Sequence, residues 1–313
     1  MKTTVSRRTA PGADRSLAVN ILALAELKTV AAAFCSAKVD VMALKGAYLI
    51  SEVYSNIYER QISDIDLLVR KKDLGAAELA LKRTGYTLLE GHSGRTFIRR
   101  EGAAVLAVDL HSAIPYADET EVWAGACSYV LDGQKLYSLA PEQNLLYLCY
   151  HMAGRHADLD EKWLRDIGAI FAKFDIAPEK LAALADKYGL REVCYHALNE
   201  ASERLGLAIP QNALEVLKPG SSIKNFIVRA VCSGKNRVPF ADYFMELVVH
   251  PRTLLRTLFP SPAFMKERYG AKMPLMSGFY IVRPVVLAFK GALGAFGLLF
   301  SLRRGGPEHV RRM

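Results

Sequence analysis

The chain lacks several features that would assign it to a structural class before any motif is considered. Its cysteines are odd in number and never form a C-x-x-C pair, which excludes a disulfide framework and indicates reduced core residues of a cytosolic protein. The 22 glycines and 13 prolines are ordinary counts without a repeat, so collagen-like and low-complexity classes are excluded. Residues 1–16 contain no apolar run with a cleavage site, so we expect no secretory signal.

What the chain does have is a basic balance and enough apolar residues for a substantial core. Its 313 residues are 51% hydrophobic, which suits one large domain or two smaller ones. The formal net charge of +9 favours anionic partners, namely nucleotide phosphates, nucleic acid or an anionic membrane surface. A basic stripe interleaved with aromatics is missing, and so is any recognised nucleic-acid-binding motif.

Hydrophobic periodicity predicts an α+β architecture. A helix is expected over 17–37, a strand over 41–44 with a helix over 47–54, a strand over 62–69, a helix over 72–84, and strands over 96–100 and 103–110. From residue 141 onward helical periodicity dominates, in 142–154, 160–173, 178–188 and 190–204. We therefore predict a mixed β-sheet flanked by helices and followed by a mainly helical C-terminal domain, with a disordered basic tail at 1–16, an α+β domain at 17–137, a helical domain at 141–270 and an apolar, basic-flanked segment at 274–313.

Two aspartates separated by one apolar residue lie in a strand-like run, Ser63-Asp64-Ile65-Asp66-Leu67-Leu68-Val69. Strand alternation predicts that Asp64 and Asp66 point to one face while Ile65 points into the core. Two like charges this close are unfavourable unless a cation lies between them, and carboxylate oxygens are ligands that suit Mg²⁺ or Mn²⁺. Taken alone, such a pair is a weak signal, because it is more often a solvated strand end.

A third carboxylate, Asp109, ends the apolar run at 103–108. Three carboxylates on neighbouring strands would form a two-metal site, in which the ions lower the pKa of an attacking hydroxyl and stabilise the leaving pyrophosphate. The alternative is that Asp109 only ends an edge strand. His111 shares a face with Asp109 by the same alternation, so it is a candidate for substrate contact, with a structural hydrogen bond as the alternative.

Two upstream positions are candidates for binding the phosphates of a nucleotide. Gly46 stands where the strand at 41–44 passes into a helix, and the free amides of a helix N-terminus together with the charge of Lys45 suit a phosphate. Arg60, shortly before the paired aspartates, is the second candidate, with a surface arginine as the alternative.

At this point the sequence resembles the uncharacterised nucleotidyltransferase family of the DNA polymerase beta-like superfamily. The resemblance rests on Leu44-Lys45-Gly46, Arg60, the run from Ser63 to Val69, and Val108-Asp109-Leu110-His111. It extends into the helical half through the stretch Leu145 to Asp166, with His151, Trp163 and Asp166, and through Leu258 to Pro262 and Tyr269-Gly270, so that it covers roughly residues 17–270.

The resemblance implies an enzyme that moves a nucleoside monophosphate from an NTP such as ATP to an acceptor hydroxyl or phosphate by a two-metal mechanism. It implies catalytic and metal-binding roles for Asp64, Asp66 and Asp109 with Mg²⁺ or Mn²⁺, and nucleotide binding by Lys45, Gly46 and Arg60. The broader superfamily motif has glycine or serine after its first glycine, whereas Ala47 follows here, so backbone amides and Lys45 are the phosphate donors expected. A small-molecule, sugar or peptide acceptor is favoured over nucleic acid.

The C-terminal segment leaves the partners and the location open. Residues 274–302 are strongly apolar, with only Arg283 and Lys290 charged, and Arg303-Arg304 follow. An amphipathic helix at the inner face of the membrane, involving 274–304 of a cytoplasmic protein, and a helix packed on protein are equally compatible with this pattern. Two functional alternatives also remain: a non-catalytic nucleotide-binding regulatory or antitoxin-like module, and a membrane-surface component of an envelope polysaccharide or peptide natural-product pathway. Convergence of the three carboxylates in space is what the enzyme hypothesis requires.

Overall fold

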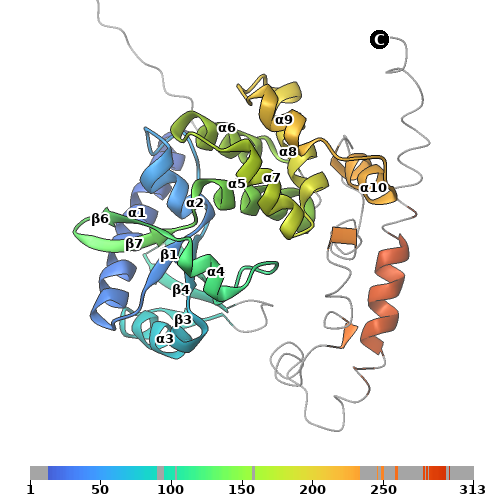
Figure 1. Ribbon diagram of the computed structural model, residues 1–313. Helices are drawn as coiled ribbons and strands as arrows, with labels where there is room; N and C mark the ends of the chain where they lie inside the picture. Colours follow the sequence, from blue (N-terminus) through green and yellow to red (C-terminus); the bar gives the residue numbers. More distant parts are fainter. Residues whose placement is uncertain are drawn as a thin grey trace, which may run out of the picture. The chain divides into compact units, whose positions relative to one another are not determined.

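The computed structural model describes residues 13–89, 95–102, 104–156 and 159–232, together with short stretches between 245 and 296. The chain divides into two compact units, Met1–Ala140 and Pro141–Met313 (Figure 1). Most of the predicted tail at 1–16 and much of the segment at 274–313 lie outside the described residues.

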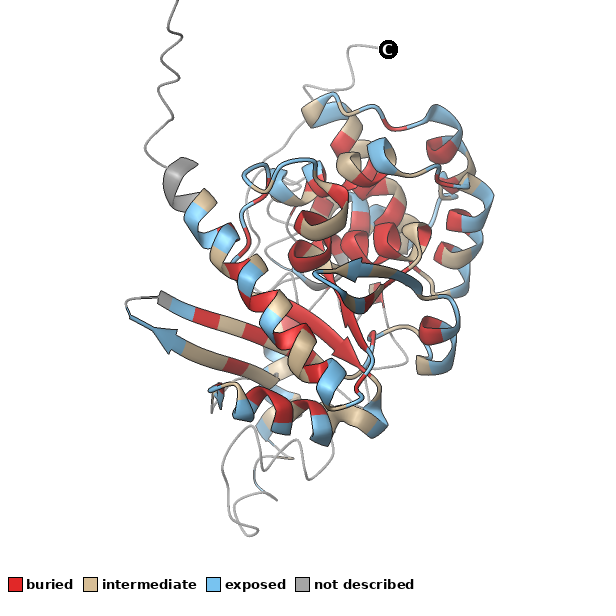
Figure 2. Cartoon of the chain, turned by 90° about the vertical axis from the view of Figure 1, so that its left-hand side faces the viewer, coloured by how far each residue is buried: buried red, intermediate tan, exposed pale blue. Residues whose placement is uncertain are grey.

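The first unit is built on one mixed sheet of seven strands in the order β3-β4-β5-β2-β1-β7-β6. The β2–β5 and β1–β7 pairs are parallel and the other pairs are antiparallel. The strands are β1 (Val41–Ala43), β2 (Ile65–Val69), β3 (Thr87–Leu88), β4 (Arg95–Glu101), β5 (Ala104–His111), β6 (Cys127–Leu131) and β7 (Gln134–Ser138). β1 and β2 are buried along their whole length (Figure 2), as expected of central strands covered on both faces.

The helical elements of this unit are α1 (Ala13–Ser36), α2 (Lys45–Tyr48), the π-helix η1 (Leu49–Val53), the 3₁₀-helix η2 (Lys71–Asp73), α3 (Leu74–Arg83) and α4 (Glu119–Ala124). α1 packs against α2, α3 and β7. Among the described residues, its stretch Leu17–Ser36 is the one helix long and apolar enough by composition to cross a membrane. Its side chains Leu27, Val30 and Phe34 are nevertheless buried within the unit, as in the core helix of a folded domain.

The second unit contains helices only among its described residues. They are α5 (Pro141–Cys149), continued by the π-helix η3 (Tyr150–Arg155), α6 (Glu161–Lys173), α7 (Pro178–Lys187), α8 (Arg191–Leu205), α9 (Gln211–Leu217) and α10 (Ile223–Cys232). α8 contacts each of the other α-helices in this set, so it is the centre of the bundle. It ends at Gly206 in the left-handed conformation that favours glycine.

The fold class is as predicted, but several boundaries are not. The strand expected over 62–69 begins only at Ile65, so Asp64 precedes the strand and strand alternation does not place it. The helix expected over 47–54 begins at Lys45 and changes to a π-helix at Leu49. The hairpin of β6 and β7 was not predicted, although Asp132 and Gly133 both have positive φ, at 52° and 77°, in a two-residue turn for which Asp-Gly is a standard sequence.

Candidate active site

The register of four neighbouring strands brings the candidate residues together. In the parallel pairing of β2 with β5, Asp66 lies directly beside Asp109. In the antiparallel pairing of β5 with β4, Thr96 lies directly opposite Asp109. On the other side of β2, the backbone amide of Leu44, at the end of β1, donates to the carbonyl oxygen of Asp66 at 3.0 Å. Lys45 therefore follows β1 at the level of the two aspartates.

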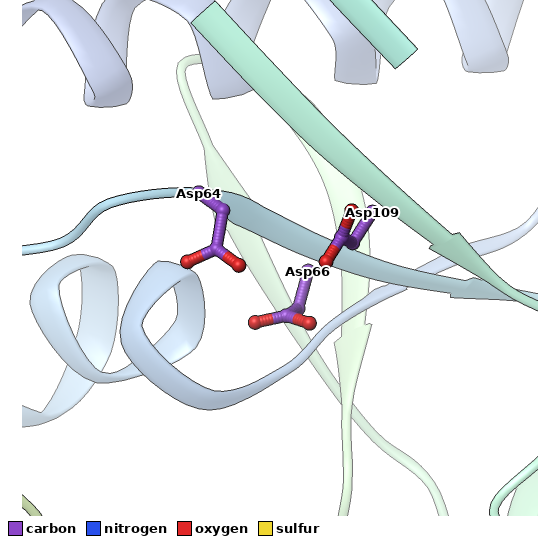
Figure 3. Close-up of side chains that lie close together, drawn as sticks. All are labelled: Asp64, Asp66 and Asp109. Atoms are coloured by element: carbon purple, nitrogen blue, oxygen red, sulfur yellow. The ribbon is translucent and has the colours of Figure 1, made fainter. Parts of the chain in front are cut away.

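Asp64, Asp66 and Asp109 form what we call the carboxylate cluster. One carboxylate oxygen from each residue lies within 4.8 Å of the others, and the side chains gather in one place (Figure 3). Asp66 is buried and the other two are half-buried. The convergence that the sequence led us to expect is thus present. Asp66 and Asp109 are far apart in the chain, and the register of β2 with β5 brings them together.

Asp66 is the most strongly held member of the cluster. Its Oδ1 accepts hydrogen bonds from Nζ of Lys45 at 2.7 Å and from Nε2 of His111 at 2.9 Å. Burial would raise the pKa of Asp66, but the hydrogen bond from His111 and the charge of Lys45 outweigh it, so this pKa is lowered from its usual value. Because an ionised carboxylate only accepts, His111 has its Nε2 proton directed at Asp66. His111 therefore makes a hydrogen bond to another side chain of the site. Its contact with substrate stays a prediction.

Asp64 has the opposite electrostatic balance. Burial raises its pKa, the negative charge of Asp66 adds to this effect, and a hydrogen bond of 2.6 Å from Oγ of Ser63 only partly offsets them. Asp109 accepts a 2.6 Å hydrogen bond from Oγ1 of Thr96. The resulting site has three carboxylates close together and is favourable for a cation.

The donor set fits a small divalent cation. Within the described part of the chain, the carboxylate cluster is the group of ionisable side chains whose ligand atoms are close enough to hold a metal ion. Its donors are all carboxylate oxygens, the ligand type that Mg²⁺ and Mn²⁺ take, and no sulfur or imidazole donor belongs to it. Carboxylates of this kind would leave further coordination positions for water and for phosphate oxygens.

The start of α2, where the two predicted phosphate-binding residues lie, is conformationally and sterically restricted. Lys45 has a φ of 47°, a left-handed conformation that is costly for a residue other than glycine and that often occurs at functional sites. A Cβ atom on Gly46 would lie 2.7 Å from Cγ2 of Ile62, so only glycine fits there without a shift. Contact of either residue with a nucleotide stays a prediction.

Arg60 is not the surface arginine of the alternative interpretation. Only 8% of it is exposed, and its guanidinium donates to the carbonyl oxygen of Gln61. One of its Nη atoms lies 4.0 Å from the position that a Cβ on Gly46 would take, so Arg60 borders the turn that contains Lys45. A phosphate contact by Arg60 stays a prediction.

Sequence reasoning missed the residues that hold the cluster in place. Asn20 of α1 is fully buried, and its Nδ2 donates to the carbonyl oxygens of Ile57 and, at 2.7 Å, of Arg60. Its Oδ1 accepts from the amide of Ile62 at 3.1 Å, so this side chain fixes the loop that leads to Asp64. Thr96 and Ser63 were missed as well. For Thr96 a signal existed in the closeness of the two strands along the chain, since β4 ends at Glu101 and β5 begins at Ala104, which pairs Thr96 with Asp109.

Comparison with known proteins places the chain in a family. The model of a family described as uncharacterised nucleotidyltransferase matches residues 13–206. No curated protein matches the chain significantly. Three solved structures are similar. ANT(2'')-Ia in complex with adenylyl-2''-tobramycin is 17% identical, with 53% of this chain and 95% of that chain covered and a TM-score of 0.40. The antibiotic-resistance factor ANT(2'')-Ia in solution is 16% identical, with 59% of this chain and 99% of that chain covered and a TM-score of 0.42. An antigenic nucleotidyltransferase-like protein from Paracoccidioides brasiliensis is 16% identical, with 64% of this chain and 92% of that chain covered and a TM-score of 0.42. These likenesses are slight, and the assignment rests on the family model, which spans the whole first unit from α1 onward and reaches the end of α8. The chain belongs to the uncharacterised nucleotidyltransferase family.

Proposed function

We propose that the protein transfers a nucleoside monophosphate from an NTP to an acceptor hydroxyl or phosphate with the help of two divalent cations. The observation that supports this most directly is the convergence of Asp64, Asp66 and Asp109 within 4.8 Å in a chain of this family. In the reaction, a bond forms between the acceptor oxygen and the α-phosphorus while the bond to pyrophosphate breaks, and the acceptor proton passes to solvent. Bound Mg²⁺ would supply acidity to the acceptor hydroxyl and charge neutralisation to the leaving pyrophosphate.

The positions of the side chains support the following proposed roles. Asp64 and Asp66 would hold both cations, and Asp109, from the neighbouring strand, would help hold the one that faces the acceptor. Lys45 and the amide of Gly46 would bind the donor triphosphate, and Arg60 would stand beside them as a further cation for phosphate. His111 would act as a positioning residue, because it directs a hydrogen bond at the carboxylate of Asp66.

The acceptor is proposed to be a small molecule, a sugar or a peptide. The cluster lies on two strands, and just before one of them, in a small α+β unit whose sequence contains no recognised nucleic-acid-binding motif. A panel of α-labelled NTPs with Mg²⁺, incubated with candidate acceptors of these classes and analysed by mass spectrometry, tests both the donor and the acceptor. We expect products heavier than the acceptor by one nucleoside monophosphate.

The matched control for the carboxylate cluster is Asp40, an exposed carboxylate at the other end of β1 that lies 3.9 Å from Arg70. Asp66→Asn and Asp109→Asn are expected to abolish transfer, whereas Asp40→Asn leaves it unchanged. Equal transfer by folded Asp66→Asn protein would overturn the proposed site. If the wild-type protein binds NTP with Mg²⁺ but transfers nothing to any acceptor class, the non-catalytic nucleotide-binding module replaces the enzyme.

A second candidate function, attachment to an anionic membrane surface, is supported by the distribution of charge. Residues 251–313 contain eleven of the 41 Lys and Arg residues and two of the 32 Asp and Glu residues, so this segment alone accounts for the net charge of +9. Within it, residues 282–293 are helical. Exposed apolar side chains recur there at helical spacing: Val282, Val285, Val286, Phe289 and Leu293. An apolar helix face in a strongly basic segment suits anionic lipid.

Two valines with similar exposure allow a controlled test of membrane attachment. Val285 is 65% exposed on this helix, and Val130 is 68% exposed on β6. In flotation with vesicles that contain phosphatidylserine, Val285→Asp is expected to reduce the bound fraction, and Val130→Asp is expected to behave as the wild type. Equal binding to neutral phosphatidylcholine vesicles, or no effect of Val285→Asp, would contradict attachment through this face.

A further inference from the structure

Lys45 occupies a position where it competes with a cation. Its ammonium lies 2.7 Å from Oδ1 of Asp66, and the two side chains are only 16% and 4% exposed. Asp66 is at the same time a member of the carboxylate cluster, whose ligand atoms lie within 4.8 Å of one another. A cation bound to the cluster would therefore be only a few ångströms from a positive charge in a partly buried site.

The mutual repulsion of these two cations is large enough to matter. Two positive charges a few ångströms apart repel each other strongly in a site partly shielded from water, and a divalent ion doubles the charge on one side. The protein can relieve this repulsion in two ways: Lys45 can leave Asp66, or an anion can join the two cations. A triphosphate supplies that anion, and the four-carbon stem of lysine gives the ammonium the freedom to turn from Asp66 to a phosphate.

The backbone at Lys45 is held in place by its neighbours. The φ of 47° at Lys45 is a strained conformation, and the turn is held by the amide of Leu44 on the carbonyl of Asp66. The close approach of Gly46 to Ile62 fixes the next residue as well. The Cα of Lys45 is thus anchored beside the cluster, within reach of both Asp66 and any phosphate bound there.

We propose that Lys45 makes the site selective for the metal–nucleotide complex over the free divalent cation. Without nucleotide, the ammonium neutralises Asp66 and weakens the binding of a cation to the cluster. When a cation arrives with a nucleoside triphosphate, the phosphate oxygens accept hydrogen bonds from the Lys45 ammonium. The carboxylate of Asp66 then becomes available to the cation. This inference rests on the proposed nucleotidyltransferase function and adds the form in which the donor substrate is taken up.

A Mn²⁺ titration of the full chain in the absence of nucleotide tests the inference without turnover. Electron paramagnetic resonance of the free ion reports how much Mn²⁺ remains unbound. Lys45→Met is expected to tighten Mn²⁺ binding roughly tenfold or more, because the competing charge is gone. Lys45→Gln carries the same expectation and keeps a polar group beside Asp66, whereas Lys45→Arg keeps the charge and should bind Mn²⁺ as weakly as the wild type. Lys38→Met is the matched control, since Lys38 is an exposed lysine that also has a positive φ, of 57°.

The same titration with a non-hydrolysable NTP analogue separates this inference from the proposed function. The wild type is expected to bind Mn²⁺ more tightly with the analogue than without it, and the gain should be smaller in Lys45→Met and Lys45→Gln. If the folded neutral variants bind free Mn²⁺ no more tightly than the wild type, the role of Lys45 is overturned while the metal site stands. If the wild type binds no Mn²⁺ even with the analogue, the proposed function itself is overturned.

Discussion

Thr96 on β4 donates a hydrogen bond of 2.6 Å to Oδ1 of Asp109, the residue directly opposite it on β5. This bond orients the carboxylate of Asp109 and leaves its second oxygen available to a ligand. Thr96 is therefore a positioning residue for the carboxylate cluster, and the loss of a partner of this kind typically costs about 10- to 100-fold in metal affinity.

Replacing Thr96 by valine keeps its shape and removes the hydroxyl. We expect Thr96→Val to weaken binding of Mn²⁺ with an NTP analogue by roughly 10- to 100-fold, the range typical of a lost partner of a metal ligand. Thr96→Ser restores the hydroxyl and should restore most of the affinity. If valine and serine have the same effect, the side chain acts through packing in the sheet and not through Asp109.

Asn20 connects α1 to the loop that precedes Asp64. Its three hydrogen bonds to backbone groups of Ile57, Arg60 and Ile62 are made from a fully buried position. Asn20→Ala would leave these backbone groups without their partner, so we expect the free energy of unfolding in urea to fall by about 2–4 kcal/mol. Thr29→Ala, an exposed change on the same helix, is expected to stay within about 0.5 kcal/mol of the wild type. A similar loss in both variants would show that the buried hydrogen bonds of Asn20 are not its cause, since alanine itself favours the helix.

Gly46 and Gly75 provide a pair of contrasting glycines. A Cβ at Gly46 would lie 2.7 Å from Cγ2 of Ile62, whereas a Cβ at Gly75 on α3 would meet nothing within 4 Å. We expect Gly46→Ala to destabilise the protein by roughly 1–3 kcal/mol through overpacking and to displace Lys45. Gly75→Ala should stabilise it by roughly 0.5–1 kcal/mol through better helix propensity. Thermal unfolding of both variants decides, and a stabilising Gly46→Ala would contradict the close packing of this turn.

The charge of Asp64 is expected to destabilise the folded protein when no metal is bound. Folding raises the pKa of Asp64 above its usual value of 3.8, through burial and then through the charge of Asp66. The folded protein therefore holds the Asp64 proton more tightly than the unfolded chain does. Its contribution to stability decreases as the pH rises from 3.8 through the raised pKa, and the deficit remains at neutral pH.

Asp64→Asn removes this charge, so in EDTA at neutral pH it should raise the melting temperature by roughly 2–5 °C. Below about pH 3, Asp64 is protonated in both the folded and the unfolded state, and the difference between the two proteins should vanish. The measurement is a series of thermal unfolding curves over this pH range. An Asp64→Asn protein that is less stable than the wild type at neutral pH would refute the electrostatic account.

Much of this fold follows from local patterns. The run from Ile65 to Val69 is apolar except at Asp66, which predicts a buried strand. In the structure every residue of the run, Asp66 included, is buried. The helices of the second unit follow from apolar residues at helical spacing, with Pro178 at the start of α7 and Gly206 at the end of α8 as local signals. Local patterns also made Asp109 a candidate, since it stands near the end of the next long apolar strand.

The arrangement of the site depends on contacts that local patterns do not specify. The ion pair of Lys45 with Asp66 joins the end of one strand to the start of another, and the hydrogen bonds of Asn20 join a helix to a distant loop. Neither follows from the spacing of residues along the chain. Thr96 is intermediate between these cases. Alternation within one strand does not reveal it, but the antiparallel pairing of the two successive strands β4 and β5 does.

The central claim is that Asp64, Asp66 and Asp109 together bind the cations that accompany a nucleoside triphosphate. The most direct measurement is the number of Mn²⁺ ions bound per chain in the presence of a non-hydrolysable NTP analogue, for the wild type and for Asp66→Asn. We predict about two ions for the wild type, as a two-metal site requires, and a loss of at least one of them in Asp66→Asn. A wild-type protein that binds no Mn²⁺ under these conditions, or a folded Asp66→Asn protein that binds as many ions as the wild type, would contradict the claim.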